Sequence, residues 1–197
     1  MKKHLPILLP AACAALMGLS LPANALVMVI GNQLAHDCFE IAKAGNDPTN
    51  GIATCSSALE NEALSPHDRA GTYVNRGAIK IALGRVDDAM NDYNTGITIM
   101  PSLADAYVDR AGAFIMQRKF DSAMIDVNHG IELGPTYPFV GYYNRAVAEQ
   151  LQGKITEAYF DYQKTLQLEP KFAPAAERLK DFVVTKAPAA GGKPPGG

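Results

Sequence analysis

The sequence has no marked excess of charge of either sign. Its 197 residues include 18 Lys and Arg against 20 Asp and Glu, which gives a formal net charge of -2. A nucleic-acid-binding domain normally has a strong basic excess, and a disordered chain is poor in apolar residues, which make up 48% of this one. The composition therefore indicates one globular domain and argues against a nucleic-acid partner.

The sequence also lacks the motifs of the common catalytic and cofactor sites. It contains no GxSxG, no HExxH and no dinucleotide-binding glycine motif. The pair His67-Asp68 fits an ordinary helix start, and the carboxylates of Asp87 and Asp88 fit a solvated helix face. We therefore expect a protein that is not an enzyme, with no cofactor, no metal and no small-molecule substrate.

A long uninterrupted hydrophobic run is missing as well. The basic start at residues 1–4 is followed by an apolar stretch at 5–21 that prolines interrupt, and then by Ala23-Asn24-Ala25. This layout is typical of a secretory signal peptide over residues 1–25, cleaved after Ala25, and it predicts a periplasmic or secreted product. A retained membrane anchor and a lipoprotein modified at Cys13 remain as alternatives.

Cysteine is rare, with three residues in the whole chain. Cys13 lies in the predicted leader, which leaves Cys38 and Cys55 as a pair in an oxidising compartment, and this predicts a disulfide between them. Two buried free thiols, or a metal or catalytic site with His36, are the alternatives. The second of these lacks any CxxC or HxxxH spacing.

A repeat with a period of about 34 residues occupies the middle of the chain. Three segments align, at 70–103, 104–137 and 139–172. In each, apolar residues recur at helical spacing in two stretches separated by a short turn, and a proline ends the unit. The matched columns are Tyr73, Tyr107 and Tyr142; Arg76, Arg110 and Arg145; Gly77, Ala111 and Ala146; Ala89, Ala123 and Ala158; Asp92, Asp126 and Asp161; and Pro101, Pro135 and Pro170.

These columns resemble the tetratricopeptide repeat, whose aromatic, small, alanine and proline positions recur with this same period. The resemblance implies an all-α, right-handed solenoid of helical hairpins with about three repeats. Around them we expect a degenerate N-terminal hairpin at 32–66 and a capping helix at 174–185, within a domain at 26–186. The Pro- and Gly-rich tail at 187–197 is expected to be disordered.

Charged pairs recur at one phase of the repeat. Arginine precedes aspartate by the same interval in every unit, which places the two opposite each other across the hairpin. We interpret the pairs as structural ties between helices rather than as a binding surface: Arg76 with Asp92, Arg110 with Asp126, and Arg145 with Asp161. In the degenerate hairpin Cys38 falls at the arginine phase and Cys55 faces it, so a disulfide there would replace the ion pair.

In the family the first helix of each unit lines a concave groove. Carried over to this sequence, the groove residues are Val74, Ala78, Ile81, Val108, Gly112, Ile115, Met116, Val140, Tyr143, Val147 and Leu151. The basic clamp of some family members is missing, because Asn75, Asp109 and Asn144 occupy the candidate polar positions. Such a groove suits an apolar peptide or an amphipathic helix, although curvature of the solenoid could bury part of it.

These features predict a non-catalytic protein-protein interaction module of the bacterial cell envelope, with a protein or peptide partner. The alternative is a self-associating structural component, in which the apolar surface forms a homo-oligomer or is filled by the chain's own final helix.

Overall fold

The computed structural model describes residues 7–8, 23–29 and 33–184. Most of the predicted leader and the whole tail at 187–197 lie outside these ranges. Within them, no helix is long and apolar enough to cross a membrane. The helices are α1 (Gln33–Ala44), α2 (Pro48–Asn61), α3 (Pro66–Ala82), α4 (Val86–Ile99), α5 (Ala104–Met116), α6 (Phe120–Leu133), α7 (Pro138–Leu151), α8 (Ile155–Leu168) and α9 (Ala173–Leu179).

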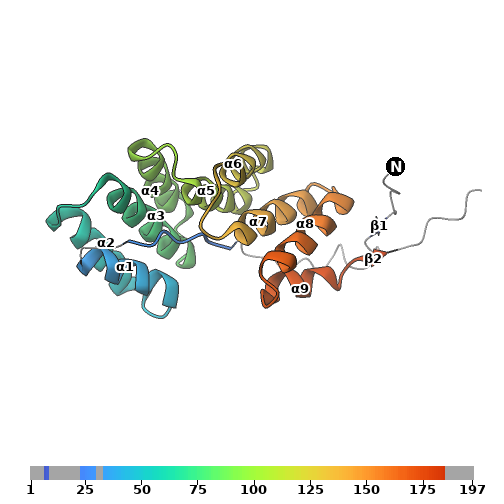
Figure 1. Cartoon of the computed structure of the whole chain (residues 1–197), viewed down its shortest axis with the longest axis horizontal. Coiled ribbons are helices and arrows are strands. Elements are labelled where there is room, and N and C mark those ends of the chain that lie inside the picture. The colour runs from blue at the N-terminus through green and yellow to red at the C-terminus, as the bar shows by residue number, and fades with distance from the viewer. Residues whose placement is uncertain (1–6, 9–22, 30–32, 185–197) are drawn as a thin grey trace, which may run out of the picture.

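Consecutive helices form antiparallel hairpins that stack into a solenoid (Figure 1). The hairpins α3/α4, α5/α6 and α7/α8 are the three predicted repeats, α1/α2 is the degenerate one, and α9 packs on α8. Because one hairpin cannot cover its own apolar face, each contributes to a core that it shares with the next. The first helices also contact one another, α3 with α5 and α5 with α7, and so form one continuous inner face.

Local sequence explains where these helices begin and turn. Ser65 caps α3, its hydroxyl oxygen accepting a bond from the Asp68 N–H at 3.1 Å, with Pro66 in the first turn. In two of the three central hairpins the turn uses glycine in the left-handed region, Gly84 at φ 72° and Gly153 at φ 78°. The middle repeat has Arg118 at the same phase with φ 58°, a conformation that is costly for a residue with a Cβ.

The C-terminal cap is shorter than predicted. We expected a helix over 174–185, but α9 ends at Leu179 and the chain then turns. The ring of Phe182 lies 5.6 Å from that of Tyr159 and 5.9 Å from that of Tyr162, so burial of this one side chain outweighs continuation of the helix.

The last described residues are extended instead of helical. Strand β2 (Val183–Val184) pairs antiparallel with β1 (Ile7–Leu8), in the register Ile7 with Val184 and Leu8 with Val183. β-branched residues favour this geometry over a helix. Apart from this short ladder, the described secondary structure is helical, and the all-α prediction is confirmed.

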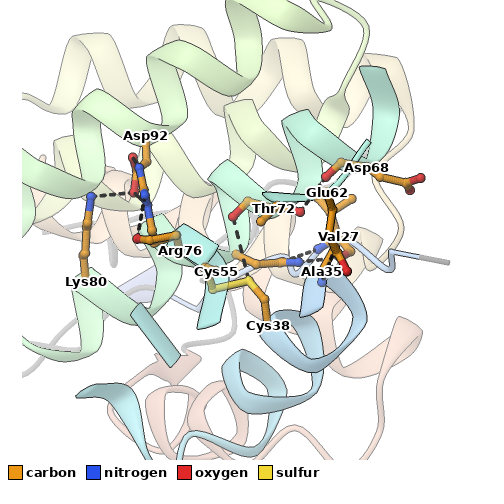
Figure 2. The surroundings of a disulfide bond; sticks show 12 residues. Val27, Ala35, Cys38, Cys55, Glu62, Asp68, Thr72, Arg76, Lys80 and Asp92 are labelled. Atoms are coloured by element: carbon orange, nitrogen blue, oxygen red, sulfur yellow. Dashed lines mark hydrogen bonds and ion pairs between the residues drawn. A yellow bond between two sulfur atoms is a disulfide. The ribbon is translucent and has the colours of Figure 1, made fainter. Parts of the chain in front are cut away.

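A disulfide joins α1 to α2 (Figure 2). The Cα atoms of Cys38 and Cys55 are 4.9 Å apart, both residues are fully buried, and they pack with Ile79 of α3. The Glu62 carboxylate accepts the N–H groups of Leu34 and Ala35, at 2.9 and 3.1 Å, in the first turn of α1. The disulfide therefore joins the middles of the two helices, and Glu62 joins the end of α2 to the start of α1.

Each predicted Arg–Asp pair forms a two-pronged ion pair inside its own hairpin. Arg110 donates from Nε and Nη2 to Asp126 at 2.7 and 2.9 Å, and it also donates to Asn94 of the preceding unit at 2.8 Å. The aspartates are buried, and the guanidinium of Arg110 lies over the ring of Tyr107. Because the partners are desolvated and fully bonded, these pairs act as structural ties.

The repeats differ in the residue type at one further matched position near these aspartates. In the first unit Lys80 adds a second cation, with its Nζ 2.6 Å from Asp92 (Figure 2). In the second unit the column holds Phe114, whose ring lies under Arg110. In the third it holds Glu149, where burial and the nearby Asp161 raise the pKa of the carboxyl to about 7.

Glu149 should make stability depend on pH. Because its pKa is raised by folding, the fold favours the protonated form, and that contribution is present below about pH 4.5 and lost as pH rises to about 7. We expect Glu149→Gln to stabilise the protein by about 1–2 kcal/mol at pH 8, with part of the shift discounted for solvent screening. Urea unfolding from pH 4 to 8 measures the difference. The exposed Glu132→Gln serves as the control, and an equal pH profile for all three proteins would contradict the prediction.

Candidate functional site: the concave groove

The inner face of the solenoid is occupied by the chain's own residues 23–29. This segment has no helix, and it crosses α3, α5 and α7, as the extended blue trace in Figure 1 shows. Its backbone is bound by side chains of those helices at every second residue. We refer to residues 23–29 as the strap.

Two asparagines at the same phase of their repeats bind the strap identically. Asn75 of α3 accepts the Val27 N–H at 2.9 Å and donates to the Val27 carbonyl at 2.7 Å. Asn144 of α7 does the same for Ala23, with both bonds at 2.9 Å. A primary amide has both a donor and an acceptor, so each asparagine satisfies both polar groups of one residue. This recognition is directed at the main chain and is independent of the bound residue's side chain.

The middle unit has an aspartate at this phase. Asp109 of α5 accepts the Ala25 N–H through Oδ1, while its Oδ2 has no hydrogen-bond partner. Asp109 is 1% exposed. Burial, with a contribution from Asp105 one turn earlier, raises the pKa of the Asp109 carboxyl well above its usual value.

The strap's side chains alternate between buried and more accessible positions, as in a β-strand. Ala25, Val27 and Val29 are at most 2% exposed, whereas Met28 is 48% exposed. Val27 fits closely because its partner is Gly71, where an added Cβ would lie 2.6 Å from Val27 Cγ1. Beyond the asparagines, His36 Nδ1 lies 3.2 Å from the carbonyl oxygen of Val29. The groove therefore accepts small and β-branched residues at alternate positions.

The predicted groove residues fall mostly in three apolar clusters that also include residues of the strap. Val108 and Val140 form one cluster with Ala25. Val74, Ile81 and Met116 share a second cluster with Val27. Ala23 packs against the third cluster, together with Ile115, Tyr143, Val147 and Leu151. The remaining two, Ala78 and Gly112, are buried.

The sequence did not predict what occupies the groove. It also did not predict the role of Asn75, Asp109 and Asn144, which we call the polar column. Residues 23–25 were treated as part of a leader and the final helix was offered as the internal occupant, whereas in the described residues the strap lies in the groove. Asn75, Asp109 and Asn144 were noted only because they replace a basic clamp. Two signals pointed further, the recurrence of short polar residues at one inward phase and the apolar alternation of Ala23, Ala25, Val27 and Val29.

The groove's donors and acceptors bind the main chain of the strap. Across the part of the chain that the structure describes, no group of three or more His, Cys, Asp or Glu could hold a metal ion. Among the polar groups that contact the strap, His36 binds a carbonyl and Asp109 accepts an amide N–H. This arrangement can hold an extended chain in one register.

Comparison with known proteins supports this fold. No protein-family model matches the chain, and no curated protein matches it. Among solved structures, the first TPR domain of human RPAP3 is 28% identical with a TM-score of 0.54, covering 59% of this chain and 90% of that one. The first TPR of Spaghetti (RPAP3) bound to the HSP90 peptide SRMEEVD is 28% identical with a TM-score of 0.52, covering 56% of this chain and 87% of that one.

A longer match is the crystal structure of MamA. It is 17% identical, with a TM-score of 0.55, and covers 77% of this chain and 94% of that chain. At this identity the likeness concerns the fold alone. Taken with the repeat period, the matched columns and the stacked hairpins, these similarities show that the chain has the tetratricopeptide-repeat fold.

Proposed function

We propose that the protein is a non-catalytic interaction module of the bacterial cell envelope that binds an extended, apolar segment of a partner protein in its concave groove. The observation that carries the proposal is the strap, which lies in the groove with its backbone bound to Asn75, Asp109 and Asn144. A partner segment would take the same register, using its N–H and C=O groups for affinity and small side chains at alternate positions for fit.

The groove chemistry favours a neutral segment over an acidic one. The similar RPAP3 domains are described in complex with the peptides SRMEEVD and SGPTIEEVD, which carry several carboxylates. In this chain the inward polar column holds two neutral amides and the buried carboxylate of Asp109. An acidic peptide would find no cation among these three side chains, and burying its carboxylates unpaired is costly. We therefore expect a peptide segment as the ligand, but a neutral one.

The predicted leader supports an envelope location. Its cleavage would also change which residues occupy the groove. A chain cleaved after Ala25 would lack Ala23 and Ala25, the residues that bind at Asn144 and Asp109. The half of the groove lined by Val108, Val140 and Asn144 would then be free for a partner, while Val27 and Val29 would retain their contacts with α1–α3.

Photo-crosslinking in intact cells tests this proposal. Phe139 and Tyr137 pack beside Ala23 and Ala25, so benzoylphenylalanine at Phe139 replaces one aromatic ring with another at the opened end of the groove. We expect a discrete heterologous adduct from this position and none from Phe160 on α8, which is 54% exposed. The adduct should fall at least tenfold with Asn144→Ala, because the partner's N–H and C=O then lose their bonds.

The control is Asn91→Ala, which removes an exposed amide from α4 and should leave the adduct unchanged. Adducts of twice the protein's mass would instead support the self-associating alternative. Adducts that persist undiminished with Asn144→Ala would contradict main-chain recognition in the groove.

A further inference from the structure

Asp109 is the exception in the polar column that binds the strap. Its counterparts Asn75 and Asn144 each accept an N–H and donate to a C=O, but an ionised aspartate can only accept. Asp109 accordingly makes one bond to the strap, and its Oδ2 is buried with no partner. A buried carboxylate oxygen without a hydrogen-bond partner is destabilising. The position beside Asp109 is therefore suited to a group other than the peptide amide that each asparagine binds.

Within the described residues, no cation compensates Asp109. None of their salt bridges includes it. The titratable groups beside it are Asp105 on the same helix and Tyr93 on α4, an acid and a phenol. The Arg–Asp ion pairs within the hairpins differ in this respect. Asp126 is 5% exposed, and Arg110 is bonded to both of its carboxylate oxygens. A cation supplied through the groove would compensate the Asp109 carboxylate.

We propose that the Asp109 carboxylate is a binding site for a primary ammonium group, and that its occupant is the α-ammonium of Leu26 in the processed chain. The proposal rests on the export and cleavage that form part of the proposed function. Hydrolysis of the Ala25–Leu26 peptide bond by a signal peptidase adds one water, leaving a carboxylate on the released leader and an ammonium on Leu26. That ammonium supplies the donors and the positive charge that Asp109 lacks.

The geometry of the strap places this ammonium close to the carboxylate. Asp109 binds the N–H of Ala25, and the nitrogen of Leu26 is the next one along a chain whose successive Cα atoms are ~3.8 Å apart. Val27 is held by two bonds to Asn75, and its side chain is 2% exposed. A terminus tethered one residue before this anchor has little freedom to leave the site.

Burial also sets the order of events. Ala25 is fully buried in the groove, so a peptidase could not reach its carbonyl once the strap is in place. Cleavage must therefore precede docking, and the new terminus enters the groove as the domain folds.

Acylation of the terminal amine tests the inference. The full chain is exported with its own leader and purified, and mass spectrometry of the intact product identifies its first residue. The α-amine is then labelled with an acetylating reagent at pH 7, because only the unprotonated amine reacts and an ion pair raises its pKa above the usual ~7.7–8.0. We expect at least tenfold slower labelling of Leu26 in the folded protein than in 8 M urea, and at least tenfold faster labelling with Asp109→Asn than with the folded wild type.

The matched control is Asp88→Asn, on the outer helix α4, which should label like the wild type. If Asp109→Asn does not fold, the wild-type comparison between native and urea-unfolded protein decides alone. A product that begins elsewhere than Leu26, or an α-amine that reacts equally in all states, would overturn the inference. Either result could occur while the Asn144-dependent adducts persist, so the two proposals fail separately.

Discussion

Arg110→Met is expected to destabilise the protein by about 3–5 kcal/mol, because it leaves the carboxylate of Asp126 buried without a cation. Asp126 is 5% exposed and is bonded by Arg110 at both oxygens. The second unit has Phe114 where the first has Lys80, so no second cation can take over. Chemical unfolding in urea at pH 7 measures the loss.

Two variants distinguish the stability lost by burying an unpaired charge from the stability lost through poorer packing. Arg76→Met should cost clearly less, because Lys80 stays 2.6 Å from Asp92. The double variant Arg110→Met with Asp126→Asn should recover most of the lost stability, since no charge then remains buried. Equal losses for Arg76→Met and Arg110→Met would show that the second cation contributes nothing.

Breaking the Cys38–Cys55 disulfide should have the second large effect, a loss of about 3 kcal/mol. The bridge spans a sequence separation of 17, and in the chain-entropy model closing a loop of this length restricts the unfolded ensemble by about that amount. The terminal hairpin has a stacked neighbour on one side only, so its helices α1 and α2 should lose protection first. The Cys38→Ala, Cys55→Ala double variant, followed by urea unfolding and amide hydrogen exchange, measures both effects.

Reduction provides the internal control for this prediction. Dithiothreitol should destabilise the wild type to about the level of the double variant and leave the variant itself unchanged. If exchange in α7 and α8 increased as much as in α1 and α2, the effect would be global and the terminal hairpin would have no special dependence on the bridge.

Most of the repeat architecture could be predicted from the sequence. The repeat period located the three central hairpins because each repeats the same local pattern, and the constant separation of 16 placed arginine opposite aspartate in each unit. Helical periodicity and turn residues act over a few positions, so they can be read without knowledge of distant contacts. The short cap was mispredicted because burial of Phe182 depends on Tyr159, which lies on the preceding helix α8 and not in the local sequence of the cap.

What occupies the groove was not predicted. Val74, Val108, Val140 and Tyr143 lie in the apolar clusters that also include residues of the strap, and the polar column was noted without its role. The strap lies in the groove through contacts between residues up to 121 positions apart, as between Ala23 and Asn144. No local pattern encodes a pairing of that range.

The sequence by itself therefore determined the helical hairpins, their number and the ties within them, because these follow from periodicity and from residues that recur at one phase. Only the tertiary structure decided what occupies the groove, and that the strap binds across three helices. The physical reason is that stacking brings Asn75, Asp109 and Asn144 into one row. Only such a row can bind an extended backbone at every second residue.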